Sequence, residues 1–145
     1  MFFKKKSLVS AADDARLMQA IRSAEDKTSG EIRVHLDRTC NGDPLDACKK
    51  KFAELNMHQT KDRNGILFYL ALESRSFAVW GDEGIHQKVS DDFWKSITEC
   101  AIGHFKNNEL ITGIEKAVEL CGEKLKTHFP LAADDKDELS NTISY

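Results

Sequence analysis

The unbroken apolar run Ile66–Leu72 constrains the fold of this chain more than any other segment. A strand without alternation of apolar and polar residues is typical of a central strand covered on both faces. A turn signal at Glu73–Ser76 and a second apolar stretch at Phe77–Trp80 complete a predicted antiparallel hairpin. The polar loops Asp62–Gly65 and Gly81–Gly84 are then expected at one end of that hairpin, where functional side chains concentrate.

Helical spacing of apolar residues predicts four helices around the hairpin. Ser10 is placed to cap the first, Asp43-Pro44 to start the second and Ser90-Asp91-Asp92 to start the third. The fourth carries apolar residues from Leu110 to Leu125. Between the first two helices, Glu31–Asp37 alternates with period two, which predicts a strand with one polar-lined face.

The order helix, strand, helix, strand, strand, helix, helix predicts an α/β fold, a three-layer α/β/α sandwich with a small mixed β-sheet between helices. The helix between the first two strands is a crossover, which allows those strands to be parallel, whereas the second and third are antiparallel. We expect an N-terminal extension over residues 1–9, a single domain over residues 10–130 and a flexible acidic tail over residues 131–145.

Composition narrows the classes of function. The 145 residues carry a formal net charge of −3 with both signs mixed, which disfavours a nucleic-acid partner. No segment approaches the length of a membrane span or a signal sequence, so we expect no membrane span and a cytoplasmic protein, and we take a monomer as the default. The four cysteines lack the close spacing of a zinc or dithiol motif and are expected to be reduced.

Carboxylates gather between the second strand of the hairpin and the next helix. They are Asp82, Glu83, Asp91 and Asp92, with Gly81 and Gly84 beside the first two. Oxygen ligands of this kind suit Ca²⁺ or Mg²⁺, although the spacing is not that of an EF-hand. In the alternative interpretation, Asp91 and Asp92 only complement the helix dipole, and Asp82 and Glu83 are solvated turn residues.

The loop before the central strand offers further candidates. Asp62 and Asn64 are able to add oxygen ligands, and Arg63 to meet an anion. In the alternative interpretation this is a turn, in which Asn64 and Gly65 supply unusual backbone angles. No histidine pair has ligand spacing, and the common phosphatase, kinase and hydrolase signatures are absent from the sequence.

The chain resembles the TPM domain family from about Ala15 to Phe129. The resemblance is carried by Lys27–Val34, Arg63–Leu67, Gly81–Ile85, Asp91 and Gly113. It implies an α/β/α sandwich, a divalent-cation site in the loops at the ends of the strands, and a phosphatase label proposed for plastid members. On this resemblance the cation role falls on Asp82 and Asp91, and also on Glu31, Asp62 and Asn64.

Three hypotheses follow. In the first, the domain binds Ca²⁺ or Mg²⁺. In the second, the same cation assists hydrolysis of a phosphate ester, on a small molecule or a protein, with Arg63 as a catalytic residue. In the third, the chain is an interaction module that uses the basic cluster Lys49–Lys51 or the terminal Met1-Phe2-Phe3; a solvated helix face and a frayed terminus are the alternative.

Overall fold

The computed structural model describes residues 7–131 and 138–145. Helices and strands alternate in the first half of the chain, and helices follow in the second. Their bounds are α1 (Ala11–Glu25), β1 (Glu31–Asp37), α2 (Pro44–Glu54), β2 (Gly65–Ala71), β3 (Ser76–Gly81), α3 (Glu83–His86), α4 (Asp91–Phe105) and α5 (Leu110–His128).

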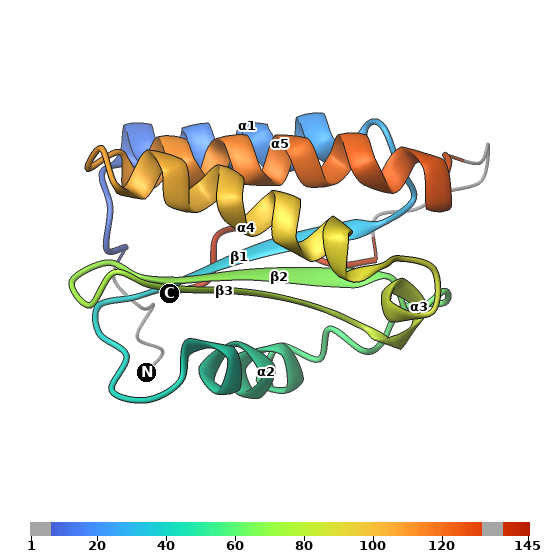
Figure 1. Ribbon diagram of the computed structural model, residues 1–145, viewed down its shortest axis with the longest axis horizontal. Coiled ribbons are helices and arrows are strands. Elements are labelled where there is room, and N and C mark those ends of the chain that lie inside the picture. Colours follow the sequence, from blue (N-terminus) through green and yellow to red (C-terminus); the bar gives the residue numbers. More distant parts are fainter. Residues whose placement is uncertain (1–6, 132–137) are drawn as a thin grey trace, which may run out of the picture.

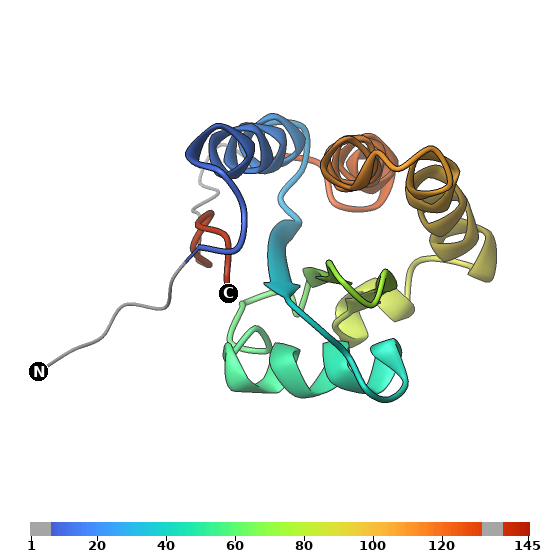
Figure 2. The same ribbon diagram turned by 90° about the vertical axis from the view of Figure 1, so that its left-hand side faces the viewer.

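The elements form the predicted three-layer sandwich. Helices α1, α4 and α5 cover one face of the sheet and α2 covers the other (Figures 1 and 2). The strand order is β1-β2-β3. Strand β1 is parallel to β2, with Glu31 opposite Gly65, and β3 is antiparallel to β2, with Gly81 opposite Ile66. This mixed sheet is confirmed, and its parallel pair follows from the crossover through α2.

Strand β2 is the buried centre of the fold. All seven of its residues are buried, as its continuous apolar sequence predicts. Alternate residues belong to two cores: Ile66, Phe68 and Leu70 pack with α1, α4 and α5. Leu67 and Tyr69 pack on the α2 side with Cys48 and Phe52.

Helix starts follow the local sequence. Ser10 accepts a hydrogen bond from the Asp13 N–H at 3.1 Å, and Asp43 accepts one from the Leu45 N–H at 3.0 Å, with Pro44 at the first helical position. The short helix α3 was expected to be loop. It forms because the Asp82 side chain accepts from the Glu83 N–H at 2.8 Å.

The region predicted as a flexible acidic tail includes residues that contact β1 and the core. Ser144 forms a parallel bridge with His35, and its backbone exchanges hydrogen bonds of 2.9 Å with Val34 and Leu36 of β1. The Ile143 side chain lies in the main core with 7% of its surface exposed. Apolar burial and paired backbone groups therefore outweigh the polar composition of the segment, which lies beside β1 (Figure 2).

Two predicted segments fall wholly or partly outside the described residues. These are the terminal Met1-Phe2-Phe3 and residues 132–137 of the acidic tail. Within residues 7–131 and 138–145, no helix combines the length and the apolar character needed to cross a membrane.

Candidate functional site

The loop end is defined here as the end of the sheet where β1 and β2 begin and β3 ends. It brings together most of the predicted site residues. Because β1 and β2 are parallel, Glu31 and Gly65 start them side by side. Because β3 runs the other way, Gly81 ends it next to Ile66. The two polar loops before β2 and after β3 therefore meet at one end of the sheet, as expected.

An arginine and an aspartate form the centre of the loop end. Arg63 donates from Nε to Asp82 Oδ2 at 2.7 Å and from Nη2 to Oδ1 at 2.8 Å. The Asp82 side chain is 6% exposed and that of Arg63 is 40% exposed. Arg63 Nη1 lies 3.3 Å from Oε1 of Glu83. These carboxylates raise the pKa of Arg63, chiefly through the Asp82 hydrogen bond. The guanidinium is thus the counter-ion of a buried carboxylate.

The backbone turn that presents Arg63 packs tightly on α3. Arg63 itself has the left-handed φ of 50°, whereas Asn64 and Gly65 do not, so the unusual angle falls one residue earlier than expected. Gly84 N–H donates to the Arg63 carbonyl at 2.9 Å. A Cβ on Gly84 would overlap the Asp62 carbonyl oxygen and lie 2.6 Å from that of Arg63. Only glycine allows this approach.

Glu31 and Asn64 hold neighbouring chain segments in place. Glu31 is buried, and its Oε1 accepts from the Leu139 N–H at 2.7 Å and from the Glu138 N–H at 2.5 Å. Asn64 is also buried, and its Nδ2 donates to the Ser29 carbonyl at 3.2 Å. Both predicted ligands therefore make contacts that fasten the C-terminal segment and the loop before β1.

The remaining predicted ligands lie farther out. Asp62 is exposed and lines a hollow of about 360 Å³ together with Ser29, Gly84 and Lys88. Asp91 and Asp92 are exposed in the first turn of α4. Neither lines the hollows found on either side of α3, so the structure does not bring them to Arg63 and Asp82.

The residues at the loop end fit a hard cation in chemistry but not in their present arrangement. Asp62, Asp82 and Glu83 supply carboxylate oxygens. Both Asp82 oxygens, however, are bonded to Arg63. Among the residues that the structure describes, no group of three or more His, Cys, Asp or Glu side chains is placed to hold a metal ion.

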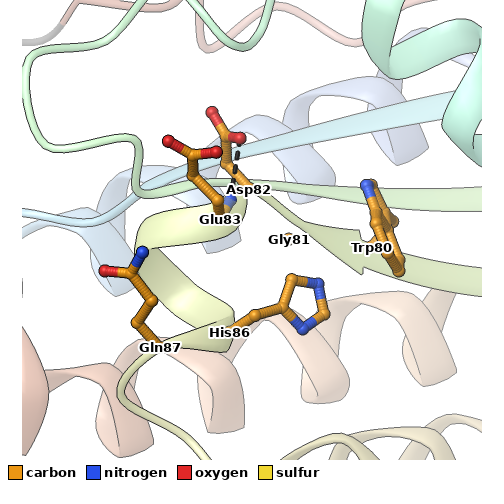
Figure 3. Close-up of a pocket in the computed structure, with 6 residues that line it drawn as sticks. All are labelled: Trp80, Gly81, Asp82, Glu83, His86 and Gln87. Atoms are coloured by element: carbon orange, nitrogen blue, oxygen red, sulfur yellow. Dashed lines mark hydrogen bonds between the residues drawn. The ribbon is translucent and has the colours of Figure 1, made fainter.

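A hollow of about 390 Å³ opens beside the ion pair, along the end of β3 and the start of α3. We call it the β3 hollow. Its lining residues are Trp80, Gly81, Asp82, Glu83, His86 and Gln87 (Figure 3). The indole and the Glu83 carboxylate lie on opposite sides of Gly81 in this view. The hollow thus combines an aromatic wall with an acidic wall.

A second polar cluster lies at the far end of the parallel strand pair. His35 Nε2 lies 2.7 Å from Asp37 Oδ1, and its Nδ1 lies 2.8 Å from Ser144 Oγ. The Tyr69 hydroxyl donates to Asp37 Oδ2 at 2.7 Å, and its ring stacks on His35 at 5.8 Å between centroids. Four side chains from β1, β2 and the C-terminal segment therefore form one connected network.

The sequence analysis did not select this network. The signal available was the spacing of His35 and Asp37, which places both on one face of β1. Burial raises the pKa of Asp37, but the hydrogen bonds from Tyr69 and His35 outweigh burial, and the pKa is lowered. Since Ser144 belongs to a segment expected to be flexible, its partnership with His35 was not predictable from spacing.

The basic cluster of α2 has local partners. Lys51 Nζ lies 2.8 Å from Oε2 of Glu54. Lys49 Nζ lies 4.4 Å from the centre of the Trp80 ring. These contacts favour a helix face that is partly paired with its own surroundings.

The fold and the loop end define a class of protein, an α/β/α domain whose polar loops meet at one end of a small mixed sheet. The chain belongs to the TPM domain family, because the family model described as TPM domain matches residues 3–124. This confirms the family resemblance found in the sequence. No curated protein matches the chain.

Two solved structures are similar to the chain. The BA42 protein from the psychrophilic bacterium Bizionia argentinensis is 41% identical, with a TM-score of 0.89 and 97% of each chain covered. The N-terminal domain of the cg2496 protein from Corynebacterium glutamicum is 15% identical, with a TM-score of 0.66, covering 86% of this chain and 79% of that one. The second likeness shows the fold alone.

Proposed function

We propose that this TPM domain binds a divalent cation, Ca²⁺ or Mg²⁺, at the loop end, in exchange for Arg63. The observation that carries the proposal is the Asp82 carboxylate, which is 6% exposed and is neutralised by one 40% exposed arginine side chain. Asp82 and the neighbouring Glu83 and Asp62 would supply oxygen ligands. The TPM family resemblance supports the same chemistry.

The local charge supports a divalent ion. The loops Asp62–Gly65 and Gly81–Gly84 are in backbone contact and together carry three carboxylates and one arginine, a net charge of −2. A long, half-exposed arginine side chain is able to move into water at modest cost. In this proposal the arginine and the metal compete for the same carboxylate, so the arginine lowers the affinity for metal.

Titration of the unmodified protein and of three variants tests this competition. Heat and amide NMR shifts are followed with Ca²⁺ and then Mg²⁺. Asp82→Asn is expected to abolish binding, whereas Arg63→Gln, which removes the internal cation, is expected to tighten it by about threefold or more. Arg38→Gln is the control, because Arg38 is 69% exposed and pairs with Glu73 at 3.9 Å, away from the loop end. Amide spectra establish that each variant is folded.

The proposal fails if the unmodified protein shows no saturable change at millimolar metal. It also fails if Arg63→Gln binds metal no better than Arg38→Gln does. Shifts are expected at residues 62–65 and 82–84. The choice between Ca²⁺ and Mg²⁺ follows from the same titration, since Mg²⁺ demands a stricter geometry.

Metal-assisted hydrolysis of phosphate esters is the alternative function, with Arg63 as the catalytic residue. The observed contacts favour it less, because all three guanidinium nitrogens face carboxylates. Turnover of p-nitrophenyl phosphate that is lost with chelator and in Arg63→Gln would support an enzyme.

A third candidate, an interaction module at Lys49–Lys51, would be supported by a partner captured by the unmodified protein but not by a Lys50→Gln variant.

A monomer in the cytoplasm is the setting that we propose for this domain. All four cysteines are free thiols, which supports a reducing compartment. Light scattering after gel filtration tests the monomer, and fractionation of cells tests the compartment.

A further inference from the structure

The β3 hollow has chemistry that the cation exchange at Arg63 does not use. Its aromatic wall is Trp80, whose ring lies 4.6 Å from that of His86. His86 also lies 5.2 Å from Trp94, so the histidine ring is held between two indoles. Gly81 separates the aromatic wall from the carboxylates without a side chain of its own (Figure 3). The floor of the hollow is therefore backbone.

A glycine is required at that floor. A Cβ on Gly81 would lie 2.6 Å from the Trp94 ring and 3.1 Å from Ile85 Cβ. Such a methyl group would displace the α4 indole. The glycine therefore allows Trp94 of α4 to pack against the backbone that joins β3 to α3.

The charges around the hollow select a positive ligand. Its six lining residues include two carboxylates and neither a lysine nor an arginine. Arg63 bonds both oxygens of Asp82, but Glu83 faces it at 3.3 Å through one oxygen only and is 63% exposed. The Glu83 carboxylate therefore retains capacity for a second positive partner.

The indole wall attracts cations as well. The face of an aromatic ring carries negative potential, and tryptophan binds cations best among the aromatic residues. The chain shows this at Trp80, where Lys49 Nζ lies 4.4 Å from the ring centre. The ring is thus accessible to a positive group, and a cationic ligand on the same face would displace the exposed Lys49 side chain.

We propose that the β3 hollow binds a small quaternary ammonium cation, between the Trp80 indole and the Glu83 carboxylate. A quaternary nitrogen has no N–H group to satisfy, so aromatic rings, the Gly81 backbone and one nearby carboxylate meet its needs. A primary ammonium would require hydrogen-bond acceptors, but both Asp82 oxygens already accept hydrogen bonds from Arg63. The site shares Glu83 with the proposed divalent-cation site, so its test is run with chelator present to keep the two kinds of binding apart.

Choline is the probe, and 3,3-dimethylbutan-1-ol is its neutral control of nearly the same shape. With EDTA present, choline is expected to shift the Trp80 indole N–H and the Gly81 and His86 amides saturably. The neutral alcohol is expected to bind about tenfold more weakly or not at all. Equal binding of the two probes, or no saturable shift with choline, would overturn the proposal.

Variants then test the two walls. Trp80→Leu is expected to remove choline binding. Glu83→Gln is expected to weaken it by about threefold or more. Glu73→Gln is the matched control, because Glu73 is 65% exposed, close to the 63% of Glu83, and lies in the β2–β3 turn at the other end of the hairpin. If Trp80→Leu does not fold, the glutamate pair still decides, since an equal effect of both substitutions contradicts the site.

Discussion

Tyr69 donates its hydroxyl hydrogen to Asp37 across 2.7 Å, from the central strand β2 to the end of its parallel neighbour β1. The other oxygen of the same carboxylate lies 2.7 Å from His35. Burial favours the protonated acid, yet these hydrogen bonds prevail and the pKa of Asp37 is lowered. The network therefore stabilises the fold more when this carboxylate is ionised than when it is protonated.

Removal of the Tyr69 hydroxyl is expected to destabilise the protein in a pH-dependent way. A lowered pKa in the folded state contributes stability above the unfolded value of about 3.9, and that contribution is lost as the pH falls through the folded value. Tyr69→Phe should therefore cost about 1 kcal/mol at pH 7, because the Asp37 side chain is partly exposed, and less at pH 3. Urea unfolding at both values measures it.

A double-mutant cycle provides the control for this prediction. Asp37→Asn alone and together with Tyr69→Phe reports the coupling between the two side chains. A loss that is the same at pH 3 and pH 7 would contradict the assigned role of the ionised carboxylate.

Two glycines in helices are expected to respond to alanine in opposite directions. At Gly84 the new methyl group would meet the backbone carbonyls of Asp62 and Arg63, which cannot move aside as a flexible side chain would. Gly84→Ala should cost about 1 to 3 kcal/mol in the free energy of unfolding. Gly103 lies in α4 with nothing within 4 Å of a Cβ, so Gly103→Ala should gain about 0.5 to 1 kcal/mol. Thermal or urea unfolding that shifts both the same way would contradict the tight contact at the loop end.

The C-terminal segment offers a test of its place in the core. Ile143 is 7% exposed and packs in the main core, so Ile143→Ala should cost about 2 to 4 kcal/mol. Leu131 is 52% exposed, and Leu131→Ala should change stability by less than about 0.5 kcal/mol. If both variants have equal and small effects in urea unfolding, the interpretation of this segment as a flexible tail would be supported instead.

Thiol labelling at pH 8 is expected to rank the four cysteines. Burial raises the pKa of the Cys48 thiol to about 12 and raises that of Cys121 further, so neither forms the reactive thiolate in the folded protein. Burial also raises the pKa of Cys100, which is partly exposed, as is Cys40. Mass spectrometry should find Cys40 modified first, then Cys100, with the other two labelled only in denaturant. Early labelling of Cys48 would contradict the packing of α2.

Much of the fold was predictable because local signals agree with the tertiary arrangement. The apolar run of β2, the cap at Ser10 and the Asp43-Pro44 start all match the structure. The meeting of Arg63 with Asp82 followed from the hairpin, which places two loops at one end. Their pairing as counter-ions did not follow, since sequence spacing does not say which carboxylate an arginine selects.

The misses share a physical origin in contacts between distant segments. Asp91 and Asp92 were grouped with Asp82 because they are near in sequence, but α3 intervenes and turns the chain. His35 meets Ser144 from 109 residues away. The acidic composition before Ile143 indicated a flexible tail, although the residues that follow pair with β1. Periodicity in one short segment carries no information about a partner so distant in sequence.

The coverage of β1 has a consequence for self-association. Groups of the same chain bond the outer edge of β1. Glu25 Oε2 accepts from the Ile32 N–H at 2.9 Å, and the Ser144 backbone bonds to Val34 and Leu36. Among the described residues no strand pairs with the outer side of β3. A sheet with one open edge can join a second copy and then stops, whereas two open edges permit unlimited growth. By covering the edge of β1, the last residues of the chain thus limit edge-to-edge pairing to two molecules and prevent the growth of a fibre.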